Sequence, residues 1–130
     1  MANLINWLEI PVSDMERAKK FYSAVLQADI KIDEETAPGL KMGMIYTENM
    51  DMKDVGGALI KGAGYTPGES NTLVYLNANE TGGCDAFLKR VEESGGKITG
   101  PTYLITPEIG YCGFFTDSEG NRMAVHSSKN

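Results

Sequence analysis

The sequence predicts an α+β fold made of two βαβββ modules, whose concave sheets enclose a cavity. Two apolar helical stripes with one shared spacing occur in the two halves of the chain: Ala18, Phe21, Tyr22 and Val25, then Cys84, Phe87, Leu88 and Val91. Strand-like segments surround each stripe in the same order, one before it and three after it. The Gly- and Pro-rich segment 62–70 separates the halves. This recurrence predicts one supersecondary unit used twice.

The chain length and the linker define the expected domain organisation. We expect the 130 residues to form a single domain, with module 1 at residues 1–62, the linker at 62–70 and module 2 at 71–130. A half of this size buries too little surface to fold alone. The modules should therefore pair with each other, either within one chain or across a homodimer.

The composition is that of a globular protein and argues against several partners. A net charge of −6 disfavours nucleic acid and anionic membranes, which attract Lys- and Arg-rich surfaces. No apolar run approaches the ~20 residues of a membrane span, and the N-terminus lacks the basic and apolar regions of a signal peptide. Cys84 and Cys112 are too few for a disulfide framework. A reducing, cytoplasmic setting is the simplest interpretation.

In the first module, residues 4–12 are expected to form the opening strand. Trp7 and Glu9 share one face of this strand, while Leu, Ile and Val residues share the other, which predicts a pocket wall opposite a buried face. A helix follows, for which Ser13 and Glu16 fit a capping box. We expect three further strands, at residues 28–34, 39–46 and 55–61.

The second module repeats this order. We expect a strand at residues 71–78 and then a helix that is capped by Asn79 or Thr81. Three strands complete the module, at residues 97–102, 110–116 and 121–127. The polar residues 117–120 form the turn of a β-hairpin between the last two strands. This hairpin ends on His126, the only histidine of the chain.

Three stretches carry a resemblance to a known superfamily. They are EIPVSDMERAKKFYSAVL at Glu9 to Leu26, VEESGGK at Val91 to Lys97, and FFTDSEGNRMAVHS at Phe114 to Ser127. With them the chain resembles the vicinal oxygen chelate superfamily, which includes glyoxalase I, bleomycin- and fosfomycin-resistance proteins and extradiol dioxygenases. The opening Trp-x-Glu-Ile-Pro-Val is most similar to a bacterial glyoxalase-like branch. The resemblance implies paired modules around a ligand cavity.

Metal-dependent members of this superfamily carry His, Gln or Glu at four positions that face the cavity. The resemblance places three of these positions at Trp7, Leu73 and Ala124, and the fourth within residues 55–60, which contain none of these residue types. Apolar side chains cannot coordinate a divalent cation. We therefore expect no metal site of the family type and no cofactor.

Glu9 and His126 are the predicted catalytic pair. Strand alternation places His126 on the face of Ala124, and Glu9 on the face of Trp7. If both faces point into the cavity, the carboxylate could orient the imidazole for acid–base chemistry, or both groups could hold a polar ligand. The simpler interpretation is a solvated histidine at a strand end and a carboxylate bonded to nearby backbone.

The predicted ligand-binding surface is aromatic and apolar. Its members are Trp7, Met42, Met44, Leu73, Tyr75, Tyr111, Phe115 and Ala124. For Phe115, a place in the core fits the sequence equally well. The two cysteines, Cys84 and Cys112, fit the core as small apolar residues better than they fit a nucleophile.

These predictions lead to one function and two alternatives. We expect a protein that binds a small organic molecule in a cavity between its sheets, without the usual metal site of the superfamily. One alternative is a lyase or isomerase related to lactoylglutathione lyase that uses Glu9 and His126. The other is a structural homodimer whose cavity is filled by its own side chains. From the sequence, the choice between enzyme and binding protein stays open.

Overall fold

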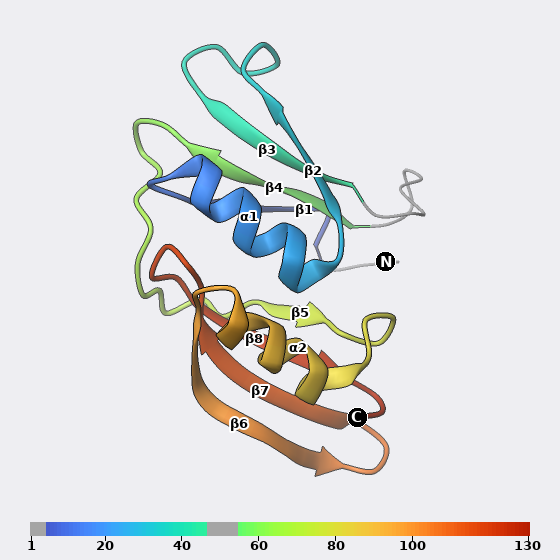
Figure 1. Ribbon diagram of the computed structural model, residues 1–130. Coiled ribbons are helices and arrows are strands. Elements are labelled where there is room, and N and C mark those ends of the chain that lie inside the picture. Colours follow the sequence, from blue (N-terminus) through green and yellow to red (C-terminus); the bar gives the residue numbers. More distant parts are fainter. Residues whose placement is uncertain (1–4, 47–54) are drawn as a thin grey trace.

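Both expected modules are present in the structure, a computed structural model that describes residues 5–46 and 55–130 (Figure 1). Module 1 contains β1 (Trp7–Pro11), α1 (Met15–Leu26), β2 (Asp29–Asp33), β3 (Lys41–Tyr46) and β4 (Gly56–Lys61). Module 2 contains β5 (Tyr75–Asn77), α2 (Gly83–Glu93), β6 (Lys97–Thr106), β7 (Gly110–Thr116) and β8 (Arg122–Ser127). The βαβββ order occurs twice, so the predicted α+β fold is confirmed. Within the described ranges, no helix has the length and apolar character that crossing a membrane requires.

Each module forms one four-stranded mixed sheet, and the two sheets share one topology. The strand orders are β1-β4-β3-β2 and β5-β8-β7-β6. The first and last strands of a module pair in parallel, and the other neighbours are antiparallel. Even the register is equivalent, because Ala58 lies opposite Glu9 and Ala124 lies opposite Tyr75. The internal repeat therefore extends from the helical stripes to single strand positions.

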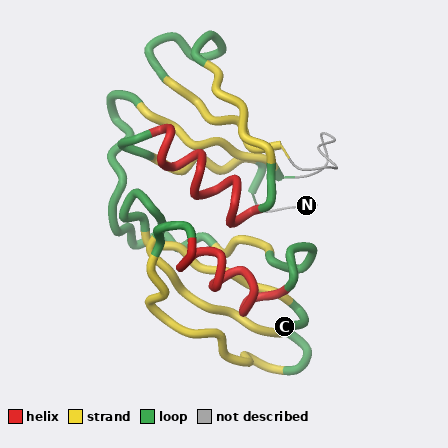
Figure 2. The backbone as a smooth tube through the Cα atoms, in the orientation of Figure 1, coloured by secondary structure: helices red, strands yellow, loops and turns green. Residues whose placement is uncertain are grey.

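The two helices lie side by side and cover the same side of the two sheets (Figures 1 and 2). Every residue of the two predicted stripes is buried in one continuous core, together with strand residues that face the helices. The Arg90 side chain of α2 also reaches α1, where its Nε donates to the Val25 carbonyl at 3.1 Å. The modules are therefore packed against each other within a single chain.

Several strands begin or end at other residues than predicted, among them β1, β5 and β6. β6 continues to Thr106 because irregularities in its register with β7, on either side of Pro101, let the strand pass a residue that has no amide donor. Its place at the sheet edge makes this possible. β5 begins only at Tyr75, although the preceding Val74 carbonyl still accepts from the Ala124 amide at 2.9 Å.

The predicted turn between β7 and β8 is present, and it lies buried between the modules. Asp117 Oδ1 accepts from the backbone amides of Glu119 and Asn121 at 2.9 and 2.8 Å, and Gly120 closes the turn with φ = 87°. The Tyr22 hydroxyl of α1 donates to Asp117 Oδ2 at 2.5 Å. Burial, followed by the charge of Asp117, raises the pKa of Tyr22 well above its ordinary value, so this hydroxyl remains a donor.

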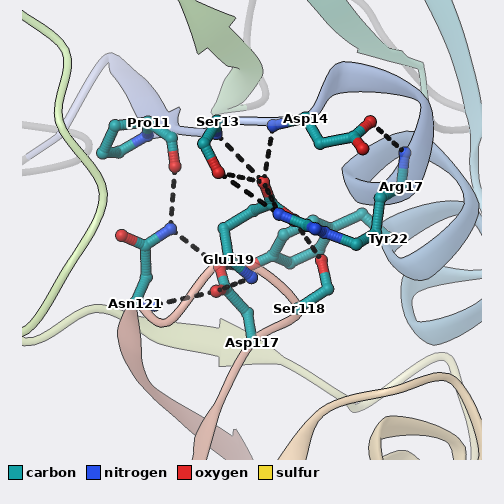
Figure 3. A network of polar contacts seen from close by, with 9 residues as sticks. All are labelled: Pro11, Ser13, Asp14, Arg17, Tyr22, Asp117, Ser118, Glu119 and Asn121. Atoms are coloured by element: carbon teal, nitrogen blue, oxygen red, sulfur yellow. Dashed lines mark hydrogen bonds and ion pairs between the residues drawn. The ribbon is translucent and has the colours of Figure 1, made fainter.

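Glu119, at the tip of this turn, caps the start of α1 (Figure 3). Its Oε1 accepts from the amides of Ser13 and Asp14 at 3.0 and 2.8 Å, and Oε2 accepts from Arg17 Nε at 2.7 Å. The Glu119 side chain has 0% exposure. Burial alone would raise the pKa of this carboxyl, but the bonds from Arg17, Asp14, Ser13 and Ser118 lower it to about 2.

The predicted capping box at α1 is wrong, because Asp14 rather than Ser13 caps the helix. The Asp14 side chain accepts from the Arg17 amide at 3.0 Å. The Ser13 hydroxyl instead donates to Glu119 at 3.2 Å. Asp14 is therefore the local cap, and Glu119 of the other module binds the residues just before the helix.

At α2 the expected caps Asn79 and Thr81 are also wrong. The N-cap is Gly82 at φ = 95°, which makes no side-chain cap bond. The first amides of α2 instead reach the end of the chain, since Cys84 donates to Ser127 Oγ at 3.1 Å and Asp85 donates to Asn130 Oδ1 at 2.9 Å.

The α1 terminus supports a test by substitution. Gln27 occupies the left-handed C-cap position, with φ = 52°, where a glycine avoids the clash of Cβ with the backbone. Gln27→Gly should raise the free energy of unfolding by about 0.5–1 kcal/mol in denaturant titrations. Ala24→Gly, at an exposed position inside the same helix, is the control and should lower it by about 1 kcal/mol. A loss of stability in both variants would contradict the left-handed cap.

The Glu119 contacts predict a specific pH dependence. Because the folded-state pKa lies near 2 instead of the ordinary 4.5, the carboxylate stabilises the fold fully above pH 4.5, and this contribution is lost as the pH falls toward 2. Glu119→Gln should cost about 2–3 kcal/mol at pH 7, as expected for hydrogen bonds to a charged group. The stability difference from the unmodified chain should shrink between pH 4.5 and 2.

Glu16→Gln is the matched control, since Glu16 is an exposed carboxylate on the first turn of α1. It should change the unfolding free energy by less than about 0.5 kcal/mol. A stability difference for Glu119→Gln that stays constant from pH 7 to pH 2 would show that the carboxylate charge contributes nothing.

Candidate functional site

A helix covers only one face of each sheet, and the opposite face is called the helix-free face here. In β1, Leu8 and Ile10 pack into the helix-side core, so Trp7 and Glu9 lie on the helix-free face. A separate small apolar cluster occupies the same face of this sheet: Met42, Ala58 and Ile60, with Met44 and Tyr65 against them. The helix-free face of module 1 therefore combines an exposed indole, a carboxylate and thioethers.

Glu9 is paired there with a tyrosine that the sequence analysis did not identify. Its charge, followed by burial and a hydrogen bond between the two side chains, raises the pKa of the Tyr65 hydroxyl. Tyr65 is positioned by a tight turn after β4, in which its amide donates to the Gly62 carbonyl at 3.2 Å. The Gly-rich composition of this segment predicts only a linker, so no sequence signal pointed to Tyr65.

Three aromatic rings gather on the helix-free face of module 2. Tyr75 and Tyr103 flank Phe114, with ring centroids 6.1 and 6.4 Å from it. Tyr75 is 50% and Tyr103 51% exposed, while the neighbouring Ala124 and Cys112 are buried. A hydrogen bond with the Cys112 side chain, followed by the electrostatic interaction with the same side chain, raises the pKa of the Tyr103 hydroxyl. This face offers planar apolar surface to a ligand.

Two residues of the predicted ligand wall, Tyr111 and Phe115, lie on the other side of β7. Phe115 is fully buried, with its ring centroid 5.7 Å from that of Phe87 on α2, and Tyr111 packs against the same core. Phe114 occupies the helix-free face instead, opposite Ala124. The register of the hairpin is the signal that could have identified Phe114, because pairing across the turn places it beside Ala124.

Glu9 and His126 lie in different sheets and interact with different residues. His126 lies in β8, opposite Asn77 and Cys112, and is half-buried. Its Nε2 lies 2.8 Å from the Ile109 carbonyl, to which it donates in the matching tautomer. Glu9 is exposed and interacts with Tyr65. Within one chain, the described contacts therefore do not join the predicted catalytic pair.

The strand positions implied for a family metal offer no suitable donors. Trp7 and Ala124 supply an indole and a methyl group, Leu73 lies half-buried just before β5, and the β4 residue beside Glu9 is Ala58. Across residues 5–46 and 55–130, no group of three or more His, Cys, Asp or Glu side chains could hold a metal ion. A hard or borderline divalent cation requires such donors, so these residues do not fit the family metal.

A cavity of about 560 Å³ lies where the modules meet. Its walls come from β1 at residues 8–11, from the linker at residues 66–70 and from the start of β8 at residues 121–123. This volume falls in the range of small-molecule sites, about 300–1,000 Å³. Glu9 borders both this junction cavity and the helix-free face of module 1.

Two mixed sheets of equivalent topology, with helices on one side only, define a protein of paired βαβββ modules. The model of the Glyoxalase/Bleomycin resistance protein/Dioxygenase superfamily matches residues 4–125, so the chain belongs to this superfamily. A glyoxylase-like domain-containing protein of Didymella fabae is 29% identical over 122 residues, which cover 93% of this chain and 91% of that protein.

Solved structures share the fold at low sequence identity. A hypothetical protein of S. aureus superposes with a TM-score of 0.67 at 19% identity, over 93% of this chain and 94% of that one. TnmS3, an antibiotic binding protein from Streptomyces sp. CB03234, superposes with a TM-score of 0.62 at 21% identity, over 96% of this chain and 95% of that one. At these identities the similarity establishes the architecture and leaves the ligand to be argued from the site.

Proposed function

We propose that this chain binds a small organic molecule between its sheets by aromatic stacking and a few polar contacts, without a metal of the superfamily type. One observation carries the proposal. The aromatic side chains on the helix-free faces remain largely exposed, with Trp7 at 40% and Tyr75 at 50%, although the helix-side core is complete. Concentrated apolar surface of this kind is typical of a contact site.

The proposed ligand wall combines both helix-free faces. Its members are Trp7, Met42, Met44, Leu73, Tyr75 and Ala124, to which the structure adds Tyr65 and Phe114. Tyr111 and Phe115 support β7 from the helix side. The description of TnmS3 as an antibiotic binding protein supports a binding role for this architecture. The junction cavity, which Glu9 borders, is a further space that the described side chains leave open, and this supports a binding role.

A lyase or isomerase related to lactoylglutathione lyase is the second candidate. In its favour, Glu9 presents an exposed carboxylate whose partner is a neutral hydroxyl. Since His126 lies on the other sheet, this candidate requires a substrate that contacts both groups, or a partner copy that brings them together. Simple binding requires neither condition, and we favour it for that reason.

The proposal is tested with 1-anilinonaphthalene-8-sulfonate, an aromatic probe whose emission rises in apolar sites. Trp7 is the only tryptophan, so energy transfer from Trp7 to the probe reports binding near β1. We expect saturable binding, weakened about 10-fold by Trp7→Ala or Phe114→Ala through lost stacking. Ile109→Ala, an exposed apolar residue outside the proposed wall, is the control.

A chelator should leave this binding unchanged, because no metal participates. Elemental analysis of untagged protein should find less than one equivalent of Zn, Ni, Fe or Mn. Binding that is lost with the chelator and restored by one of these metals would overturn the metal-free proposal. Probe affinities identical in all three variants would overturn the proposed wall.

We also propose that the chain forms a homodimer. β6 is an edge strand, and its Leu104 and Ile105 are 48% and 39% exposed, which favours contact with a second copy. Light scattering at micromolar concentration should give a mass near twice 14.1 kDa. Leu104→Glu should shift the mass toward the monomer, and Ala24→Glu on the exposed side of α1 should not. A monomer at all concentrations would refute the dimer.

We place the protein in the cytoplasm. Cys84 and Cys112 are both free and buried, and unpaired cysteines are usual where thiols are kept reduced. Fractionation of cells that express the tagged chain would test this placement.

A further inference from the structure

The junction cavity has walls that are fixed before any ligand binds. Asn121, only 5% exposed, donates from Nδ2 to the Pro11 carbonyl of β1 at 2.8 Å, and its Oδ1 accepts from the Gly68 amide of the linker at 2.9 Å. Asn121 Nδ2 also donates to Asp117 Oδ2 at 2.9 Å. One buried side chain therefore ties β1, the linker and β8 together. A preformed cavity binds a ligand with a smaller ordering cost.

Charged groups of both signs border this cavity, and none of them is neutralised by an ion pair. The carboxylates are Glu9 and Glu69, and the guanidinium is that of Arg122. All three are exposed, and none forms an ion pair with another residue that the structure describes. Glu9 interacts with the neutral hydroxyl of Tyr65. The charges of the cavity are thus free to interact with a ligand.

The remaining walls are suited to a small organic group. Leu8, Val74 and Met123 supply apolar surface. Hydroxyls come from Thr66 and Ser70 of the linker and from Thr72, just after it. A mixture of apolar walls with a few polar groups is typical of small-molecule sites, in which the polar groups fix orientation.

We propose that the junction cavity binds an amino-acid-like zwitterion, with a carboxylate at Arg122, an ammonium at Glu69 and Glu9, and an apolar side group against Leu8 and Met123. A planar guanidinium matches a carboxylate with two parallel hydrogen bonds. The carboxylates of Glu69 and Glu9, which border the cavity, are the groups that can accept hydrogen bonds from an ammonium. This inference rests on the proposed function, because Glu9 borders both surfaces.

Singly charged ligands fit this cavity less well. An anion would satisfy Arg122 but meet the two carboxylates with a charge of the same sign. A cation would satisfy Glu69 or Glu9 and be repelled by Arg122. A zwitterion satisfies both signs at once, and rejection of its singly charged analogues follows from the opposing charge as well as from the missing contact.

Three compounds with one phenyl group and different charges test the inference by calorimetry: L-phenylalanine, 2-phenylethylamine and 3-phenylpropanoate. L-Phenylalanine should bind at least about 10-fold more tightly than either analogue. Arg122→Gln should remove its advantage over 2-phenylethylamine, and Glu69→Gln should remove its advantage over 3-phenylpropanoate. Lys97→Gln and Glu108→Gln, exposed residues outside the cavity lining, are the matched controls and should keep both preferences.

The outcomes separate this inference from the proposed function. Equal affinity for the three compounds, or no heat from any of them, would overturn the zwitterion site. If 1-anilinonaphthalene-8-sulfonate still binds in that case, and Trp7→Ala still weakens its binding, the proposed function stands without the zwitterion site. Preferences that survive in Arg122→Gln and Glu69→Gln would also overturn the assignment. Loss of both the zwitterion preference and the probe binding would remove both proposals.

Discussion

The Glu119 carboxylate lies buried between the modules, where it accepts hydrogen bonds from the Ser13 and Asp14 amides, just before α1, and from the Arg17 side chain. A negative charge at a helix N-terminus interacts favourably with the helix dipole and satisfies amides that have no partner inside the helix. The same turn places Asp117 against Tyr22 and Asn121 against Pro11. One short turn of module 2 therefore sets the orientation of module 1, and the junction cavity and both helix-free faces depend on that orientation.

The start of α2 also depends on hydrogen bonds to residues that are distant in the sequence. Its first amides bond to Ser127, at the end of β8, and to Asn130, at the end of the chain. In both modules, backbone amides at or just before the helix start bond to residues that are distant in the sequence, although Asp14 also caps α1 locally. Removing these partners would leave the part-buried amides of Ser13 and Asp14, or the buried amide of Cys84, without acceptors, which costs free energy. For module 1 those distant partners belong to module 2, so the start of α1 depends on contacts between the modules.

Hydrophobic periodicity accounts for what the sequence alone predicts, because it reports which side of an element is buried. Both stripes and the turn at residues 117–120 occur where the pattern places them. The faces of β7 are not distinguishable in this way, since Phe114 and Phe115 are both aromatic and only the pairing with β8 separates them. The bond from Ser13 to Glu119 spans 106 positions, and no local pattern carries that information. The contact between Glu9 and Tyr65 could not be predicted from the sequence either, because Tyr65 lies in a segment whose composition indicates only a turn.

Comparison of equivalent positions in the two modules shows where their chemistry has diverged. On the helix side, positions matched by register remain apolar, as in Ile45 with Phe115 and Leu59 with Val125. On the helix-free side Ala58 and Ala124 are identical, but three other matched pairs differ in kind: Glu9 with Tyr75, Met44 with Phe114, and Ile60 with His126. The shared core demands apolar residues at the first set, whereas Glu9, Tyr75 and His126 of the second set belong to neither buried cluster. A ligand between the sheets would therefore meet a carboxylate and thioethers on one side and aromatic rings with an imidazole on the other. Such a site favours an asymmetric molecule, with its polar and planar parts at different ends.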